Sequence, residues 1–400
     1  MLASFLPALS DGMVAASARP SAFAGVSWRA GFPPRGREGE APVLDRFKVP
    51  EDIAVRIAPD DMRATVENMF RALGMPEADA VQAADVLIYA DVRGIESHGV
   101  SNMMRAYVHG FRNGHVNPTP DWKIVRDTGP ALYVDSDNGL GLAVGPAVMD
   151  LAIERARQYG IAFAVTSNGG HYGAAAYHAH RAVAHDMIGI SMTSGGVHVA
   201  PTFGAEPLLG LNPIGVAAPS GAEVPFLFDA SMSSVAGNKI GLLRRVGGNV
   251  APGWVAEENG APVMEEAPVP PNFLLLPLGG TRDIGSHKGF GLMMMVEVLT
   301  TVLGGTGAGP DRRTAFAHSF IAADVGAFTD LETFKADMDA YLKRLRECRT
   351  APGEERVVYP GMLEAEDEED RTANGIPYHP EVIEWFTATC DELGATHRLG

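Results

Sequence analysis

The residue pair Ser97-His98 lies in the stretch 93–100, directly after a segment whose apolar residues recur at helical spacing. Gly94 is typical of a residue that ends a helix, and Gly99 permits a second tight turn, so we expect the pair to be held between two breaks in regular structure. A histidine with an ordinary pKa of about 6.5 exchanges protons near neutrality, and an adjacent serine hydroxyl can orient its ring or share a substrate oxygen. The pair therefore predicts proton transfer at a substrate oxygen, with a histidine that only hydrogen-bonds its own loop as the alternative.

Three helices, over about 60–73, 76–92 and 101–111, are predicted to carry this turn, because apolar residues share one face there and Gly74 and Pro76 mark a boundary. Beyond residue 120 the pattern changes to a strand at 131–134, a helix opened by Gly145-Pro146 and a strand at 161–166. A strand-helix-strand succession indicates an α/β domain. Helices at 291–303 and 331–346 and a strand at 356–359 are expected further along. The acidic run 364–370 is typical of a solvated helix face.

A glycine pattern within this α/β unit imitates a dinucleotide-binding fingerprint. Gly139, Gly141 and Gly145 follow a predicted strand, but the third glycine comes one residue late. No acidic residue stands about twenty positions further on to bind a ribose, as the fingerprint requires. We therefore reject a Rossmann nucleotide site here.

A second glycine-rich segment, 167–173, precedes an alanine-rich helix. Glycines at a helix start leave N–H groups that suit a phosphate or a carboxylate, so an anion is expected there. His178, His180 and His185 in this helix suggest a metal-dependent hydrolase as another function. Their spacing argues against it, because His178 and His180 lie on different faces and no acid stands at a ligand spacing. Packing roles are favoured, and no metal site is predicted.

Composition narrows the class of protein. Four hundred residues exceed one hydrophobic core, so two or three lobes are expected. A net charge of −17 argues against nucleic acid or an anionic membrane as partner. The longest apolar run, 291–303, is shorter than a bilayer span and contains Glu297. Cys348 and Cys390 are too few for a disulfide framework, which fits a cytoplasmic location.

Residues 1–50 are rich in Ala, Ser, Pro, Gly and Arg and show no apolar period. Such a segment buries too little surface to offset its ordering entropy, so a disordered extension is predicted. A transit peptide is the functional alternative. An idle tail or a start codon placed too far upstream is favoured over it.

Six segments stand in a particular order along the chain: SHGVSNMMRAYVHGFRNGHVNPTP from residue 97, SNGGHYGAAAYHAH from 167, FGAEPLLGLNPIGVAAP from 203, PFLFDASMSSVAGNKI from 225, GSHKGFGLMMMVEVL from 285 and VVYPGMLEAE from 357. Together, between about residues 53 and 386, they resemble the malate/L-lactate dehydrogenase family of NAD(P)-dependent oxidoreductases. The resemblance implies a sulfolactate dehydrogenase-like, non-Rossmann α/β fold with a central sheet and a helical lobe built from N- and C-terminal segments. It predicts an N-terminal helical lobe (51–120), an α/β cofactor-binding domain (121–305) and a C-terminal segment packing on the helical lobe (306–400).

The function that the resemblance implies is hydride transfer between NAD or NADP and C2 of a small 2-hydroxy or 2-oxo acid. His98 would move the proton while Ser97 polarises the same oxygen. The cofactor-binding candidates carried over from the family are His171, Tyr172, Gly173, Asp229, Ala230, Ser231, His287, Lys288, Pro360 and Gly361. The family also implies a homodimer. A nucleotide-binding or assembly protein that has lost turnover is the alternative, and the intact Ser97-His98 pair argues against it.

Two departures from the family pattern fall on the substrate side. Asn102 stands four residues after His98, where many members have an arginine that binds the substrate carboxylate, and Leu211 stands where many have threonine. An asparagine cannot replace the two charge-assisted bonds of a guanidinium. Either Arg105 or Lys239 takes over the carboxylate, or the substrate is larger or differently charged. If the carboxylate has lost its partner, Asn102→Arg should improve the use of simple acids.

Overall fold

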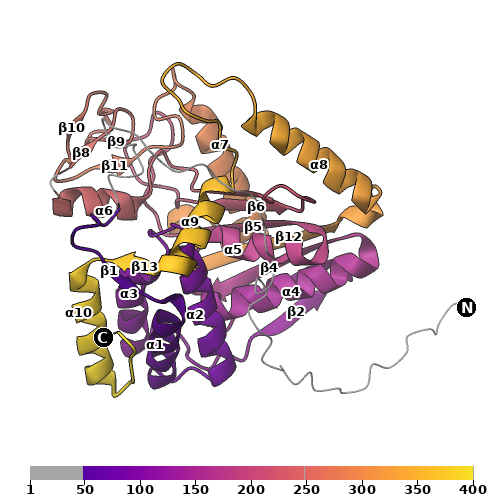
Figure 1. The fold of residues 1–400 in the computed structure, drawn as a ribbon, viewed down its shortest axis with the longest axis horizontal. Helices are drawn as coiled ribbons and strands as arrows, with labels where there is room; N and C mark the ends of the chain where they lie inside the picture. The colour runs from indigo at the N-terminus through magenta and orange to yellow at the C-terminus, as the bar shows by residue number, and fades with distance from the viewer. Residues whose placement is uncertain (1–47, 247, 400) are drawn as a thin grey trace, which may run out of the picture.

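The computed structural model describes residues 48–246 and 248–399, so the extension expected over 1–50 lies almost entirely outside the described residues. Its centre is a seven-stranded sheet with the strand order β2-β3-β4-β12-β5-β6-β7 (Figure 1). The strands are β2 (Lys123–Asp127), β3 (Ala131–Asp135), β4 (Ile161–Gly169), β5 (Met187–Gly195), β6 (Ile214–Ala218), β7 (Phe226–Ala230) and β12 (Phe316–Asp324). Only β3 and β4 are parallel, and the other neighbours are antiparallel. This mixed sheet differs from the parallel sheet of a Rossmann domain.

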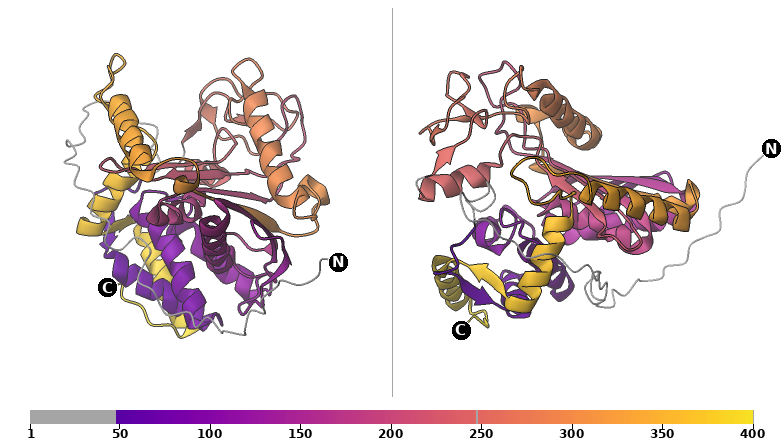
Figure 2. Two further views of the ribbon diagram at one scale, coloured as in Figure 1. Left: turned by 90° about the vertical axis from the view of Figure 1, so that its right-hand side faces the viewer. Right: turned by 45° about the horizontal axis from the view of Figure 1, so that its top comes forward.

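Helices cover both faces of the sheet (Figure 2). On one face α4 (Gly141–Tyr159) and α5 (Ala175–Arg181) pack on β3, β4, β12 and β5. Glycines on two strands allow α5 to lie close to them, because a Cβ at Gly189 would stand 2.0 Å from the Ala179 carbonyl oxygen and one at Gly215 would stand 2.7 Å from that of Ala175. On the other face α6 (Gly237–Val246) and α7 (Ser286–Glu297) enclose a separate apolar cluster with β5, β6 and β7.

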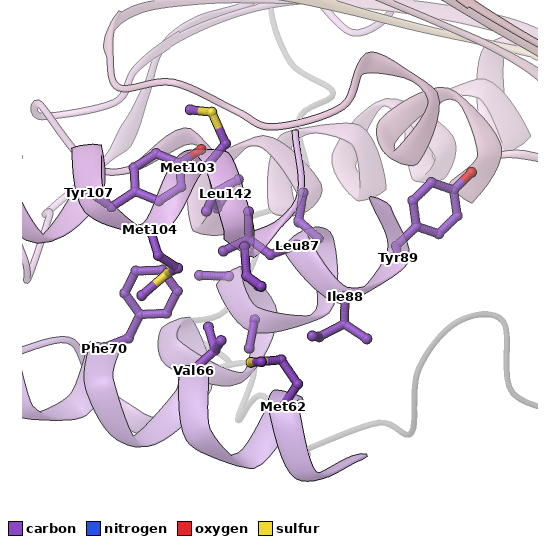
Figure 3. Close-up of a cluster of buried hydrophobic side chains, with 14 of the residues drawn as sticks. Met62, Val66, Phe70, Leu87, Ile88, Tyr89, Met103, Met104, Tyr107 and Leu142 are labelled. Carbon is purple, nitrogen blue, oxygen red and sulfur yellow. The ribbon is translucent and has the colours of Figure 1, made fainter. Parts of the chain in front are cut away.

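A helical lobe lies against the α5 side of the sheet. It consists of α1 (Pro59–Ala72), α2 (Glu77–Val92), α3 (Val100–Arg112), α9 (Met362–Asn374), α10 (Pro380–Leu393) and the strand pair β1 (Val55–Ile57) and β13 (Ile376–Tyr378). Helix α2 is apolar on most of its surface because α1, α4 and α9 all pack against it. Figure 3 shows part of this core, where Phe70 of α1, Leu87 of α2 and Met104 of α3 gather.

The remaining elements are short, apart from α8 (Leu331–Arg346), which matches the helix expected at 331–346. They are β8 (Asn249–Val250), β9 (Val255–Ala256), β10 (Ala267–Pro268), β11 (Leu274–Leu275) and the helical turns η2 (Val183–His185), η3 (Val298–Val302), η4 (Gly309–Asp311) and η5 (Val325–Ala327). In the part of the chain that the structure describes, none of the helices combines the length and the hydropathy that a bilayer crossing requires.

Several sequence expectations about elements were wrong. Helix α4 begins at Gly141 and contains Pro146, instead of starting at that proline. Helix α7 begins at Ser286, five residues before the expected 291, and continues as the π-helical turn η3. Residues 356–359 form no strand, because their link to the sheet is one backbone bond, from Leu227 N–H to the Pro360 carbonyl.

The acidic run 364–370 is also not merely a solvated face. It lies on α9, where Glu366 pairs with Arg356 and Glu368 pairs with Arg93. Arg93 and Glu366 are both buried. The Arg93 pair fixes α9 to the end of α2, and the Arg356 pair fixes it to the segment that precedes it.

Candidate active site

The Ser97-His98 turn connects α2 to α3. The end of α2 is closed by Gly94, whose φ of +73° favours glycine, and by the bond from Ile95 N–H to the Ala90 carbonyl. Within the turn, Ser97 Oγ lies 2.9 Å from Nδ1 of His98. Because Ser97 occupies Nδ1, Nε2 is the ring nitrogen of His98 that can contact a substrate. The side chains of Ser97 and His98 are both partly exposed.

His98 stacks on a second imidazole, that of His171, which follows β4. The ring centroids are 5.7 Å apart and the planes are 12° from parallel. Tyr107 Oη on α3 lies 2.7 Å from Nδ1 of His171, and the Phe316 ring meets His171 edge-on at 5.7 Å. Three segments distant in sequence, at residues 97–107, 171 and 316, thus meet at His98 and His171.

Electrostatics keeps both imidazoles neutral at physiological pH. Burial, and then the charge of Lys239, lower the pKa of His98 to about 4. Burial lowers the pKa of His171 to about 3, with the charge of His98 as the next cause. A neutral imidazole can accept a proton, so His98 is in the state that a general base requires.

Lys239 lies at the start of α6 and faces the same turn. Its neighbour Asn238 donates from Nδ2 to the Ser97 carbonyl oxygen over 3.2 Å, which docks α6 on the turn. Burial lowers the pKa of Lys239, and the charge of Glu96 opposes that shift. A cation is therefore present beside the candidate proton-transfer group.

The other three substrate-side candidates, Arg105, Asn102 and Leu211, either lie away from His98 or already make contacts within the protein. Arg105 is half exposed, pairs with Glu381 of α10 at 3.2 Å and stacks on Trp385, so it belongs to the surface between α3 and α10. Asn102 donates from Nδ2 to the Glu96 carbonyl oxygen over 2.8 Å and so braces the turn. The carbonyl oxygen of Leu211 accepts from the Met232 N–H, and its side chain packs in the core beside α7.

Two cofactor candidates are more constrained than the sequence indicated. The anion expected at the start of α5 is the protein's own Asp229, whose Oδ2 accepts from the Ala176 N–H over 2.7 Å. Burial raises the pKa of Asp229 to about 6, although the backbone hydrogen bonds from Ala176 and Ala175 lower it. Tyr172 is fully buried between the rings of His178 and His318, with centroids 4.4 and 4.6 Å away, so its side chain is part of the core.

The structure places most of the remaining cofactor candidates near the carboxyl end of β7, whereas the Pro360-Gly361 turn lies beside the start of that strand, at Leu227. Asp229, Ala230 and Ser231 end β7, and the Pro360-Gly361 turn lies beside that strand through the Leu227–Pro360 backbone bond. Gly361 has a φ of +106° and begins α9. His287 and Lys288 are exposed at the start of α7. Helix α7 packs on the segment around Leu278. The Leu278 N–H in turn donates to the carbonyl oxygen of Met232, just beyond β7.

The chemistry of these residues fits a dinucleotide. Carboxylate and hydroxyl groups at Asp229 and Ser231 suit ribose hydroxyls. The Lys288 cation and the Arg282 guanidinium, which contacts the His287 ring, suit phosphates. The start of α5 is excluded as the phosphate site because Asp229 already caps it. Among the described residues no group of three or more His, Cys, Asp or Glu side chains is arranged to hold a metal ion.

Sequence reasoning missed Tyr107, Phe316, His318 and Asp91 as residues of this region. Tyr107 also lines the helical core (Figure 3). His318 on β12 contacts Thr193 Oγ1 at 2.8 Å and the Gly170 carbonyl at 3.0 Å, which fixes the segment before His171. A polar residue inside an otherwise apolar strand was the available signal for His318.

Comparisons with known proteins agree with this architecture. The family model described as malate/L-lactate dehydrogenase matches residues 57–387. A malate dehydrogenase of Pyrococcus abyssi is 40% identical over 347 residues, which are 85% of this chain and 95% of the relative. An L-sulfolactate dehydrogenase of Methanocaldococcus jannaschii is 32% identical, covering 84% of this chain and 97% of the relative. The crystal structure of a malate dehydrogenase from Entamoeba histolytica superimposes with a TM-score of 0.81 at 29% identity, covering 86% of this chain and 99% of that one.

Proposed function

The chain belongs to the malate/L-lactate dehydrogenase family, and on that premise we propose that it transfers a hydride between NAD(P) and C2 of a small 2-hydroxy or 2-oxo acid. Enzymes of this family are NAD(P)-dependent dehydrogenases of 2-hydroxy acids. The observation that carries the proposal is the neutral His98, held by Ser97 and next to the Lys239 cation. An acid-base group beside a cation is what a hydroxy acid requires, because it reacts at a hydroxyl and carries a carboxylate.

The chain's own groups move the proton. In the oxidative direction Nε2 of His98 accepts the hydroxyl proton of the substrate, and in the reductive direction it returns a proton to the carbonyl oxygen. Ser97 stays on Nδ1, so it fixes the ring plane. The nicotinamide ring supplies or accepts the hydride when the cofactor is bound.

Lys239 is the group that we assign to the substrate carboxylate. It is partly buried, and its charge already acts on His98, whereas Arg105 is turned toward α10. A bound carboxylate would offset the charge of Lys239 and so raise the pKa of His98 toward its ordinary value.

The cofactor would contact the segment after β4 at His171 and Gly173, the end of β7, the Pro360-Gly361 turn, and His287 and the Lys288 cation at the start of α7. Through Tyr172 only backbone contacts are available, because its ring is enclosed. Both NAD and NADP remain candidates.

A homodimer is the assembly that we propose, and the surface of α7 supports it. Met294, Met295, Val298 and Val302 follow α7 into η3 and are each 40% exposed or more, although the opposite side of the same helix is buried. A helix that is apolar on all sides is normally covered on all sides. A second copy of this chain, bringing the same apolar surface, would cover it.

The experiment that tests the activity is a panel of 2-hydroxy acids with NAD and NADP, and of 2-oxo acids with the reduced cofactors, followed by nicotinamide absorbance. Malate, lactate and sulfolactate define the panel, since relatives of the chain act on malate and sulfolactate. Turnover that disappears in the His98→Ala variant supports the proposal. Absence of turnover on the whole panel with both cofactors contradicts it.

A further inference from the structure

A buried carboxylate lies directly beneath the Ser97-His98 turn. Asp91, near the end of α2, is only 1% exposed. Its Oδ2 accepts from the Val100 N–H over 3.1 Å and from the Tyr378 hydroxyl over 2.8 Å. Val100 is the first residue of α3, so Asp91 binds the backbone two residues after His98 and provides the hydrogen-bond acceptor at the start of that helix.

Gly99, between His98 and Val100, is required by this carboxylate. Its φ of −83° and ψ of −175° are accessible to any residue, so the tight turn expected from the sequence is not the reason for glycine here. A Cβ at Gly99 would instead stand 1.6 Å from Oδ1 of Asp91. The backbone beside His98 therefore rests on the Asp91 carboxylate with no room for a side chain between them.

The C-terminal segment holds the same carboxylate in place. Tyr378 belongs to β13, which pairs with β1. Arg371, at the end of α9 and 4% exposed, donates to the Asp91 carbonyl oxygen over 2.7 Å and to Glu96 Oε1 over 2.8 Å. Residues 371 and 378 thus bind both ends of the turn that carries His98, across more than 270 positions of sequence.

We propose that Asp91, held by Tyr378 and Arg371, is a positioning residue that sets the direction of the His98 ring through the Val100 N–H. That this positioning affects catalysis rests on the proposed function of His98. The contacts among Asp91, Tyr378 and Arg371 do not depend on that function. The C-terminal segment acts on His98 through Asp91 without touching substrate or cofactor.

The same helix offers a matched control for this inference. Tyr177 of α5 donates from its hydroxyl to Oδ2 of Asp85 over 2.6 Å, so it also binds a buried aspartate of α2. Tyr378→Phe and Tyr177→Phe each remove one buried hydroxyl from one such aspartate and keep the ring. Each leaves a buried carboxylate short of a donor. Because the Tyr177 hydroxyl also accepts from Gln82 and Arg181, Tyr177→Phe should lower the melting temperature at least as much as Tyr378→Phe.

Turnover should separate the two variants. Tyr378→Phe is expected to lower kcat about tenfold or more, because a small misplacement of a catalytic group is costly. The Kd of NADH, measured by fluorescence titration, and the KM of the substrate should stay within about twofold. Tyr177→Phe should keep its kcat. Unchanged kcat in Tyr378→Phe, or equal losses in both variants, would overturn the inference.

A second readout keeps the test independent of activity. The imidazole NMR signals of His98, assigned by their disappearance in His98→Gln, should shift in Tyr378→Phe and stay in place in Tyr177→Phe. A wild-type protein without turnover would contradict the proposed function while this comparison still decides whether Asp91 positions His98. Signals that stay in place in both variants would contradict the positioning role.

Discussion

The imidazoles of His98 and His171 lie face to face, 5.7 Å apart, and they cannot both carry a proton at low cost. The charge of His98 lowers the pKa of His171, which burial has already lowered. His171 therefore stays neutral when His98 takes a proton. Each ring is also held at Nδ1, that of His98 by Ser97 and that of His171 by Tyr107.

Replacing His98 by alanine should lower turnover by at least about a hundredfold, because a positioned proton-transfer group typically contributes 10²–10⁴ in rate. The affinity for the cofactor should change little. Steady-state kinetics with titrated cofactor measures both quantities. His185→Ala is the control, since His185 is exposed and contacts Arg157 far along α4. A His98→Ala enzyme that keeps most of its turnover would remove His98 from the mechanism.

Replacing Lys239 by methionine should raise the KM for the acid substrate about tenfold or more, since a charge-assisted bond contributes roughly 1.5–3 kcal/mol and about 1.4 kcal/mol is one decade. It should also move the acid limb of kcat/KM to higher pH. The charge of Lys239 lowers the pKa of His98, so removing it raises that pKa, and His98 then protonates at a higher pH. An acid limb that stays in place would show that Lys239 does not act on His98.

Much of the fold could be predicted from the sequence. The order of the motifs identified the family and its mixed α/β fold, which the comparisons confirm. The helix expected at 331–346 has the bounds of α8, because its apolar residues repeat at helical spacing and Asp330 caps it. The strand expected at 356–359 was wrong because β-forming residues there lack a partner strand, and strand pairing is not encoded locally.

The site was less predictable, for a physical reason. Local pattern singled out Ser97 and His98, since glycines on both sides mark a turn in the sequence, and the family resemblance added His171. The contacts that orient them join residues 64 positions apart, as in Tyr107–His171, or 287 positions apart, as in Asp91–Tyr378. Such pairs share no periodicity, so only the folded chain reveals them. Arg105 illustrates the same limit. Helical spacing places it one turn beyond Asn102, but it does not determine toward which neighbour the side chain points.

The protein should lose stability as the pH falls from about 6.5 to 4. Burial lowers the pKa of His178 to about 3 and that of His318 to about 4, and it also lowers those of His98, His171 and His180. In this range the unfolded chain binds more protons than the folded one at each histidine, so stability rises with pH. Burial raises the pKa of Asp91 to about 7 and that of Asp229 to about 6, and it also raises those of Glu67, Asp79 and Glu364, so these carboxyl groups oppose the trend. Only Asp91 and Asp229 among them are strongly shifted, so we expect the five histidines to dominate.

The melting temperature across this pH range measures the trend. His318→Gln should flatten the slope, because it removes one titrating ring while leaving polar atoms near Thr193 and the Gly170 carbonyl. A melting temperature that rises on acidification from about pH 6.5 would show that the buried carboxyl groups dominate instead.

Placing a charge on the exposed apolar surface of α7 should dissociate the proposed dimer. Val298 is 52% exposed, and a buried carboxylate in its place would lack a partner. Light scattering at micromolar concentration should give a dimer mass for the wild type and a monomer mass for Val298→Glu. Tyr341→Glu on α8 is the control, since Tyr341 is 60% exposed on another helix, and it should stay dimeric. A monomeric, fully active wild type would contradict the assembly.

Replacing Asn102 by arginine tests which residue binds the substrate carboxylate. If the carboxylate has lost its partner, the new guanidinium should improve kcat/KM for malate or lactate. The structure favours the opposite result, since Lys239 already lies beside His98, and a second cation there would lower the pKa of His98 further. The substitution also removes the bond from Asn102 to the Glu96 carbonyl, which braces the turn.

Asn102→Ala separates the two effects, because it removes the brace and adds no charge. We expect kcat/KM to fall in the order wild type, Asn102→Ala, Asn102→Arg, with Arg105→Ala close to wild type because Arg105 is paired with Glu381. An arginine variant more active than the alanine variant would mean that the guanidinium contributes a contact that Lys239 does not make. The carboxylate would then lack a partner in the natural protein, and the substrate would belong to a class other than simple hydroxy acids.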